Sequence, residues 1–71
     1  IKFYLKAADK ANNGFSTPTY LRKAAFAYEQ KANYTEALAT YERLKNEFGK
    51  SSDAREVDKY IARVKTLGNI Q

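Results

Sequence analysis

The stretch KANYTEALATYERL, residues 31 to 44, decides the fold. Tyr34 and Tyr41 lie seven residues apart, which is about two turns of an α-helix, and Ala37 lies between them on the same face. A methyl group inside an aromatic stripe indicates a close helix crossing, because two helix backbones approach only where the side chains between them are small. We therefore expect a helix here that packs tightly against a neighbouring helix.

Helical spacing extends through the rest of the chain. Apolar residues recur at i, i+3, i+4 and i+7 in four segments, and no long period-two alternation interrupts them. Short polar breaks near residues 12–16, 32–33 and 49–52 separate the segments. The sequence therefore predicts an all-α fold of about four helices. Because the breaks are short, consecutive helices should pack antiparallel, and residues 1–71 should form a single domain.

Several residues are placed to start or end these helices. Thr17 directly before Pro18 is a good N-cap, and proline suits the first helical turn. A glutamate follows three residues after Asn33 and three residues after Asp53, which predicts reciprocal side-chain caps for the third and fourth helices. Glycines follow three of the segments, and the first of them suits the left-handed conformation after a helix end. They are Gly14, Gly49 and Gly68.

Composition and charge narrow the classes of function. Thirteen Lys and Arg against eight Asp and Glu give a net charge of +5 and a pI of about 9.6. The basic residues alternate with acidic ones, so the excess favours acidic partners without marking a nucleic-acid-binding tract. Histidine and cysteine are absent, which removes the usual zinc ligands and two of the usual catalytic groups. We expect no enzymatic activity, no catalytic residue, no metal, no cofactor and no small-molecule substrate.

Residues 17–50 resemble a tetratricopeptide repeat. The family's pattern sets large apolar, small and aromatic residues at fixed positions along two helices. Three positions depart from it, because tryptophan is absent, alanine replaces glycine at 25, and Gly49 stands where proline is usual. The matching residues are Leu21, Ala24, Ala25, Tyr28, Tyr34, Ala37, Tyr41 and Leu44. By this resemblance, Ala25 and Ala37 are the contact points between the two helices of the unit.

The flanking segments extend the resemblance. Tyr4 and Ala7 precede Tyr41 and Leu44 by 37 residues, so residues 1–13 look like the second helix of a truncated preceding repeat. Residues 52–68 look like a C-terminal capping helix, which closes such arrays. The chain is also similar to the C-terminal ends of bacterial tetratricopeptide proteins, often membrane-anchored, that assist envelope or translocation complexes. This resemblance implies a parent protein in the bacterial cell envelope.

The resemblance implies a scaffold that binds other proteins. In tetratricopeptide arrays, the first helix of each unit lines a concave groove that holds a peptide segment. Carried over by position, the groove side chains of the second segment are Thr19, Arg22, Phe26, Glu29 and Gln30. Those of the fourth segment are Arg55, Lys59, Ala62 and Arg63.

The predicted groove has a basic and an apolar component. Arg55, Lys59 and Arg63 are spaced at i, i+4 and i+8, which predicts a basic row on one helix face. Together with Arg22, this row suits a peptide that carries Asp or Glu. Phe26 adds an apolar anchor point. A second interpretation of the row is a solvated face whose charge is tempered by the nearby acids Glu56 and Asp58.

Two other functions stay open at this level. A basic helical domain that binds nucleic acid is one, although most of the tyrosines fall on predicted core stripes rather than on exposed stacking positions. Self-association is the other, through apolar surface exposed on the first helix, and it would give a homo-oligomer. A protein or peptide partner of acidic character remains the leading expectation.

Overall fold

Four α-helices make up the computed structural model, which describes residues 1–11 and 16–70. No strand occurs in those residues, so the predicted all-α class is confirmed. The elements are α1 (Lys2–Ala11), α2 (Ser16–Gln30), α3 (Tyr34–Phe48), the short 3-10 helix η1 (Ser52–Ala54) and α4 (Val57–Leu67).

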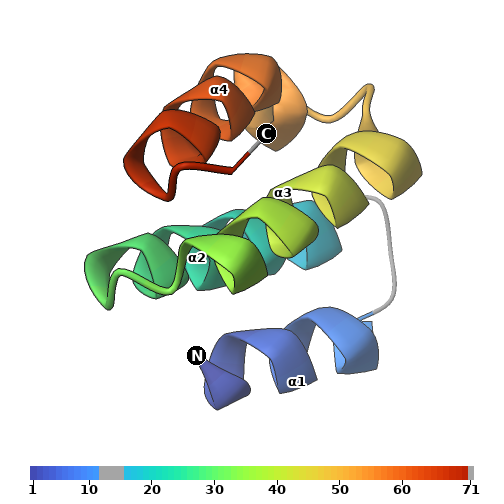
Figure 1. Cartoon of the computed structure of the whole chain (residues 1–71). Helices are drawn as coiled ribbons and strands as arrows, with labels where there is room; N and C mark the ends of the chain where they lie inside the picture. The colour runs from blue at the N-terminus through green and yellow to red at the C-terminus, as the bar shows by residue number, and fades with distance from the viewer. Residues whose placement is uncertain (12–15, 71) are drawn as a thin grey trace.

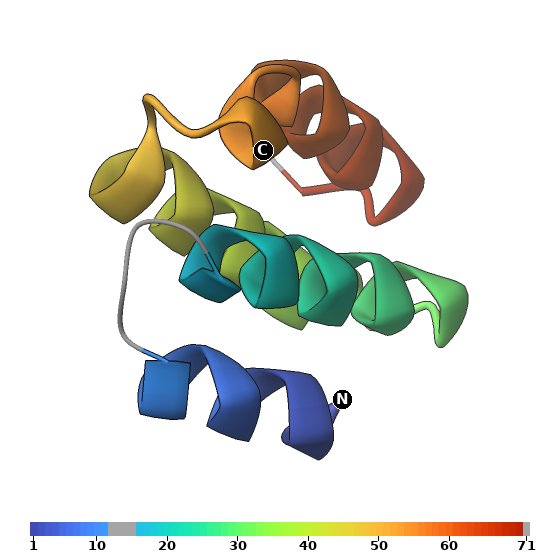
Figure 2. The same cartoon turned by 180° about the vertical axis from the view of Figure 1, so that it is seen from behind.

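The helices lie in sequence order across a flat molecule whose Cα atoms extend over 32 × 24 × 14 Å. Helix α1 lies at one end, α2 and α3 lie side by side in the middle, and α4 lies at the other end (Figures 1 and 2). Each helix runs opposite to the one before it. Consecutive helices therefore pack antiparallel, as the short connections predict.

The core is the contact between α2 and α3, where alanine carries much of the packing. Ala24 and Ala25 of α2 and Ala37 of α3 are fully buried, together with Leu21 and Leu44. Tyr41 is also buried, and Tyr28 and Tyr34 pack against the edge of this cluster. The small side chains at 25 and 37 belong to one shared buried cluster, as a close helix crossing would require.

The helix ends lie close to the predicted positions, but the predicted side-chain caps are wrong. Thr17 lies inside α2, and its Oγ1 donates a 3.0 Å hydrogen bond to the carbonyl oxygen of Ala8 in α1. Asn33 precedes α3 without a side-chain capping bond, and so does Glu56 before α4. The side chain of Asp53 turns to α2 instead of capping α4. Gly14 lies outside the described residues.

The physical reason is competition between local and tertiary partners. A cap hydrogen bond satisfies one backbone N–H, whereas Thr17 satisfies a carbonyl at the buried junction of two helices. A carboxylate that reaches an arginine makes a charge-assisted bond, which is stronger than a neutral one. Asp53 therefore lies in η1 with its side chain against α2, and the segment predicted as one helix over 52–68 is divided into η1 and α4.

Gly68 ends α4 for a reason other than backbone conformation. Its φ is −90°, which any residue can adopt. A Cβ at this position would lie 2.6 Å from the Cβ of Tyr34, at the start of α3. Glycine is therefore required here because the end of the chain approaches α3 closely.

Candidate functional site

Two hollows lie between α2 and the η1–α4 segment. The first, of about 290 Å³, is lined by Arg22, Ser52, Asp53, Arg55, Glu56 and Tyr60. The second, of about 250 Å³, is lined by Arg22, Phe26, Tyr41, Tyr60 and Arg63. Both hollows include Arg22 and Tyr60, so they lie next to each other, and we call the two together the α2–α4 groove.

The structure brings together four of the predicted groove residues: Arg22 and Phe26 from α2, Arg55 from the end of η1, and Arg63 from α4. Gln30 and Lys59 are exposed and line neither hollow. A larger open hollow of about 600 Å³ lies elsewhere, at the end of α3. Its lining consists of the consecutive residues 45–51, so it is the outside of a turn rather than a meeting place of helices.

Aromatic rings form the inner part of the groove. The rings of Tyr41 and Tyr60 have centroids 5.5 Å apart, and Tyr41 is only 1% exposed. Phe26 is 49% exposed and lines the same hollow. A half-exposed phenyl ring in a concave site is a surface that apolar side chains of a partner can cover. The inner part of the groove is therefore a concave aromatic surface formed by Phe26, Tyr41 and Tyr60, which we call the aromatic cup.

Glu29 and Arg63 form an ion pair across the groove. The Arg63 guanidinium donates a 2.8 Å hydrogen bond to Glu29 Oε1, and its Cζ lies 5.1 Å from the centre of the Tyr60 ring. The hydrogen bond to Glu29 raises the pKa of Arg63 above its usual value. Burial, followed by a hydrogen bond to the Glu29 carboxylate, raises the pKa of Tyr41. The Glu29 side chain is only 7% exposed, so it serves this network instead of facing a ligand.

Asp53 is a second anchor, between α2 and η1. Its Oδ1 accepts a 2.8 Å bond from Arg22 Nε, and its Oδ2 accepts a 2.8 Å bond from Thr19 Oγ1. Its own backbone N–H donates to the Ser51 hydroxyl at 3.1 Å. Burial alone would raise the pKa of Asp53, but the bonds from Arg22 and Thr19 outweigh it and hold the pKa below its ordinary value of 3.8. Thr19 and Arg22 therefore position η1 against α2.

The predicted basic row on one helix face is wrong. Arg55 follows η1 and precedes the first residue of α4, so it shares no helix with Lys59 and Arg63. Three of the four predicted cations have a carboxylate neighbour: Asp53 for Arg22, Glu29 for Arg63 and, at 3.9 Å, Glu56 for Lys59. Only Arg55 forms no ion pair with another described residue. The four cations and three carboxylates leave this region with a net charge of about +1.

One separation along the chain recurs in these contacts. Thr19 and Asp53 lie 34 residues apart, and so do Glu29 and Arg63. A third bond, from Arg43 in α3 to Asp9 in α1 at 3.0 Å, also joins residues 34 apart. In stacked repeats of equal length, residues one repeat apart lie beside each other in neighbouring units. Sequence reasoning missed Asp53 and Tyr60 as site residues, and this separation was the signal that could have identified the Asp53 contact.

The described residues 1–11 and 16–70 contain no group of three or more acidic side chains arranged to hold a metal ion. Within the same residues, no helix has the length and apolar character needed to cross a membrane. Comparison with protein-family models, with curated proteins and with solved structures gave no match. Function is therefore inferred from the groove itself.

Proposed function

We propose that this chain is a non-enzymatic interaction module of tetratricopeptide type, and that a segment of a partner protein binds in the α2–α4 groove. The observation that carries the proposal is Phe26. Its ring is half-exposed in a hollow whose other lining residues are Tyr41, Tyr60 and two arginines. Aromatic residues flanked by arginine, in a depression that several helices build, are the usual anchors of protein interfaces.

The repeat interpretation has support from the packing. Antiparallel helices, a crossing rich in alanine and two contacts over 34 residues that join α2 to η1 and α4 are what stacked two-helix units of about 34 residues would produce. In that arrangement α2 and α4 are the first helices of consecutive units, and the groove between them is the concave side. A generic four-helix bundle explains the alanines but gives no reason for the recurring separation.

The groove also refines the expected chemistry of the partner. Since three of four cations already have carboxylate neighbours, an apolar or aromatic side chain in the cup should contribute more than acidic contacts do. Arg55 is the cation best placed for an acidic residue of the partner, because no carboxylate of a described residue pairs with it. We expect a segment with one large apolar residue and one acidic residue near it.

The test is selection of binding peptides from a random 12-residue phage-displayed library, followed by affinity measurement on variants. Phe26→Ala should weaken selected peptides at least tenfold, because it removes the ring that their apolar residue covers. Arg55→Glu should weaken them by a smaller factor. Leu67→Ala is the matched control, because Leu67 is an exposed apolar residue at the end of α4 that lines neither hollow. Circular dichroism verifies that each variant stays folded.

Selected peptides whose affinity is unchanged by Phe26→Ala would contradict the groove assignment.

Nucleic-acid binding receives no support from the groove, since most of its cations are neutralised by neighbouring carboxylates.

A further inference from the structure

Glu29 places a carboxylate directly behind the aromatic cup. Its side chain is only 7% exposed, and it lines neither of the two hollows of the α2–α4 groove. Its Oε1 accepts the 2.8 Å bond from Arg63, and its carboxylate also bonds to the side chain of Tyr41. Both of these partners line the inner hollow of the groove. Glu29 therefore contacts the wall of the hollow from outside, where it does not face a bound side chain.

Two contacts fix the guanidinium of Arg63. Glu29 bonds to it on one side, and the ring of Tyr60 lies beneath it, with 5.1 Å between Cζ and the ring centre. The Arg63 side chain is still 41% exposed, so part of it faces the hollow. A guanidinium without a carboxylate beside it attracts anions. Because Glu29 supplies that carboxylate within the protein, the pair presents almost no net charge to a ligand.

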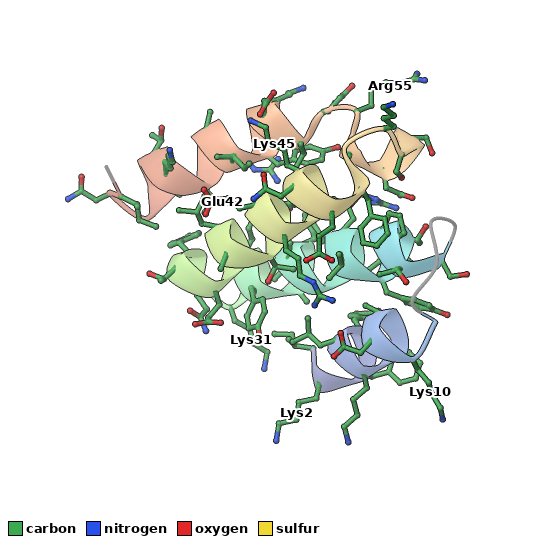
Figure 3. All side chains as sticks on the ribbon, turned by 90° about the vertical axis from the view of Figure 1, so that its right-hand side faces the viewer. Lys2, Lys10, Lys31, Glu42, Lys45 and Arg55 are labelled. Carbon is green, nitrogen blue, oxygen red and sulfur yellow. The ribbon has the colours of Figure 1, made fainter. Side chains whose placement is uncertain are left out.

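The other arginine of the inner hollow is neutralised in the same way. Arg22 donates a 2.8 Å bond to Asp53, and Asp53 does not line the inner hollow either. The two arginines and the two carboxylates thus sum to zero around the cup. Arg55, in contrast, lines only the neighbouring hollow and lies exposed at the outer edge of the molecule (Figure 3). The groove therefore combines an inner hollow of no net charge with an exposed cation farther out.

We infer that Glu29 determines the specificity of the groove: by neutralising Arg63, it makes the cup select an uncharged aromatic or large aliphatic side chain and reject a carboxylate. This inference rests on the proposed binding of a partner segment in the groove. An uncharged side chain gains from covering Phe26 and Tyr60. A carboxylate would lose hydration in the hollow without meeting a net positive charge. Glu29 acts through Arg63, so it is a positioning residue rather than a ligand contact.

A purely structural role for Glu29, as a tie between α2 and α4, would have a different signature. Loss of either member of the pair would then weaken binding of all peptides alike. If Glu29 sets the charge of the cup, its removal leaves Arg63 uncompensated and favours an anionic side chain. Removal of Arg63 leaves Glu29 uncompensated and disfavours the same side chain. The two variants should therefore change the selectivity in opposite directions.

The experiment uses the full chain and a 12-residue peptide selected from the phage library for binding that depends on Phe26. Its anchor is the apolar residue whose replacement by alanine abolishes the effect of Phe26→Ala. In place of this anchor, one form carries neutral 4-carbamoylphenylalanine and the other carries anionic 4-carboxyphenylalanine, which has nearly the same shape. Fluorescence anisotropy gives the ratio of the two Kd values. Wild type should bind the neutral form about tenfold more tightly.

Glu29→Gln should shift this ratio about tenfold toward the anionic form, whereas Arg63→Gln should shift it several-fold toward the neutral form. The double variant Glu29→Gln/Arg63→Gln lacks both charges and should return the ratio to within about twofold of wild type. Asp9→Asn is the matched control, because it removes one negative charge from an arginine pair between α1 and α3. It should leave the ratio unchanged.

A ratio that Glu29→Gln leaves unchanged, while binding still depends on Phe26, would overturn this inference alone. Peptides that bind without any dependence on Phe26 would overturn the proposed function and this inference with it. Circular dichroism verifies the fold of each variant. If Glu29→Gln does not fold, Arg63→Gln decides, and an unchanged ratio or a shift toward the anionic form in that variant would overturn the inference.

Discussion

Helices α1 and α3 carry comparable stripes of tyrosine and small residues, but they differ in how many neighbours cover them. In α3, Tyr41 is 1% exposed between α2 and α4, whereas Tyr4 of α1 stays partly exposed beside Phe3. The free energy gained from an aromatic side chain follows the apolar area removed from water. The same kind of residue therefore contributes more to the stability of the fold in α3 than in α1.

The largest expected effect comes from removing the two tyrosine rings in turn. Tyr41→Ala should lower the free energy of unfolding by about 3–5 kcal/mol, because it empties the centre of a small core and leaves Glu29 without one of its partners. Tyr4→Ala should cost about 1 kcal/mol or less, since its ring is covered on one side. Urea denaturation followed by circular dichroism measures both. Equal losses would show that α1 is as deeply packed as α3.

The second comparison enlarges an alanine in each helix. Ala37→Leu should destabilise the chain by about 1–3 kcal/mol, because the side chain would enter a fully closed contact between α2 and α3. Ala7→Leu should change the stability by about 0.5 kcal/mol or less, since Ala7 is partly exposed on α1. Thermal unfolding of the two variants checks the order. A tolerated leucine at 37 would show that the crossing does not need a small residue there.

Periodicity was sufficient to predict the helices and their antiparallel order, because each helix buries one stripe whatever it packs against. The alanines at 25 and 37 could be predicted for the same reason, since only small residues permit a close crossing. Local patterns failed at the caps of α2, α3 and α4. A capping motif indicates which backbone N–H groups a side chain can reach. It does not indicate which group of another helix competes for the same side chain. Thr17 bonds to the carbonyl oxygen of Ala8 in α1, and Asp53 bonds to Arg22 in α2.

For the groove, too, the sequence predicted which residues take part but not which contacts they make. Arg22, Phe26, Arg55 and Arg63 were predicted from position, and all four line it. The ion pairs of Arg22 and Arg63 were not predicted, because they depend on how η1 and α4 lie against α2. This packing pairs Arg22 with Asp53 and Arg63 with Glu29, whereas Lys59 lies near Glu56, three residues before it. It also brought Tyr60 into the groove, a residue that the sequence analysis did not single out.

The third comparison concerns two arginines whose acidic partners lie 34 residues before them. Arg63→Ala should cost about 1–2 kcal/mol, because the nearly buried Glu29 carboxylate loses its cation. The cost stays below that of a fully buried pair, since Arg63 is 41% exposed. Arg43→Ala should cost about 0.5 kcal/mol or less, because its partner Asp9 is exposed on α1. Chemical denaturation at low and high salt measures both, and equal costs would contradict the difference in burial.

The smallest effect concerns pH and the anchor between α2 and η1. Because the pKa of Asp53 lies below its ordinary value of 3.8 in the folded chain, the carboxylate contributes stability above the unfolded pKa. This contribution is lost as the pH falls through the lower, folded pKa. Asp53→Asn removes it at every pH, so the variant should be less stable than wild type by about 1 kcal/mol at pH 7, given an arginine partner that is partly exposed.

The two stability curves should converge as the pH is lowered below 3.8, because wild-type Asp53 then becomes neutral like asparagine. Urea denaturation at several pH values between pH 7 and the acid limit of folding measures the difference between the two proteins. Asp9→Asn is the matched control, since it removes a carboxylate that also pairs with arginine but is exposed on α1. A gap between wild type and Asp53→Asn that stayed constant with pH would show that Thr19 and Arg22 hold the side chain by geometry rather than by its charge. In that case hydrogen-bond geometry, rather than attraction between opposite charges, would hold η1 against α2. The positive charge of Arg22 would then still be available to an acidic residue of a partner, although its side chain stays bonded to Asp53.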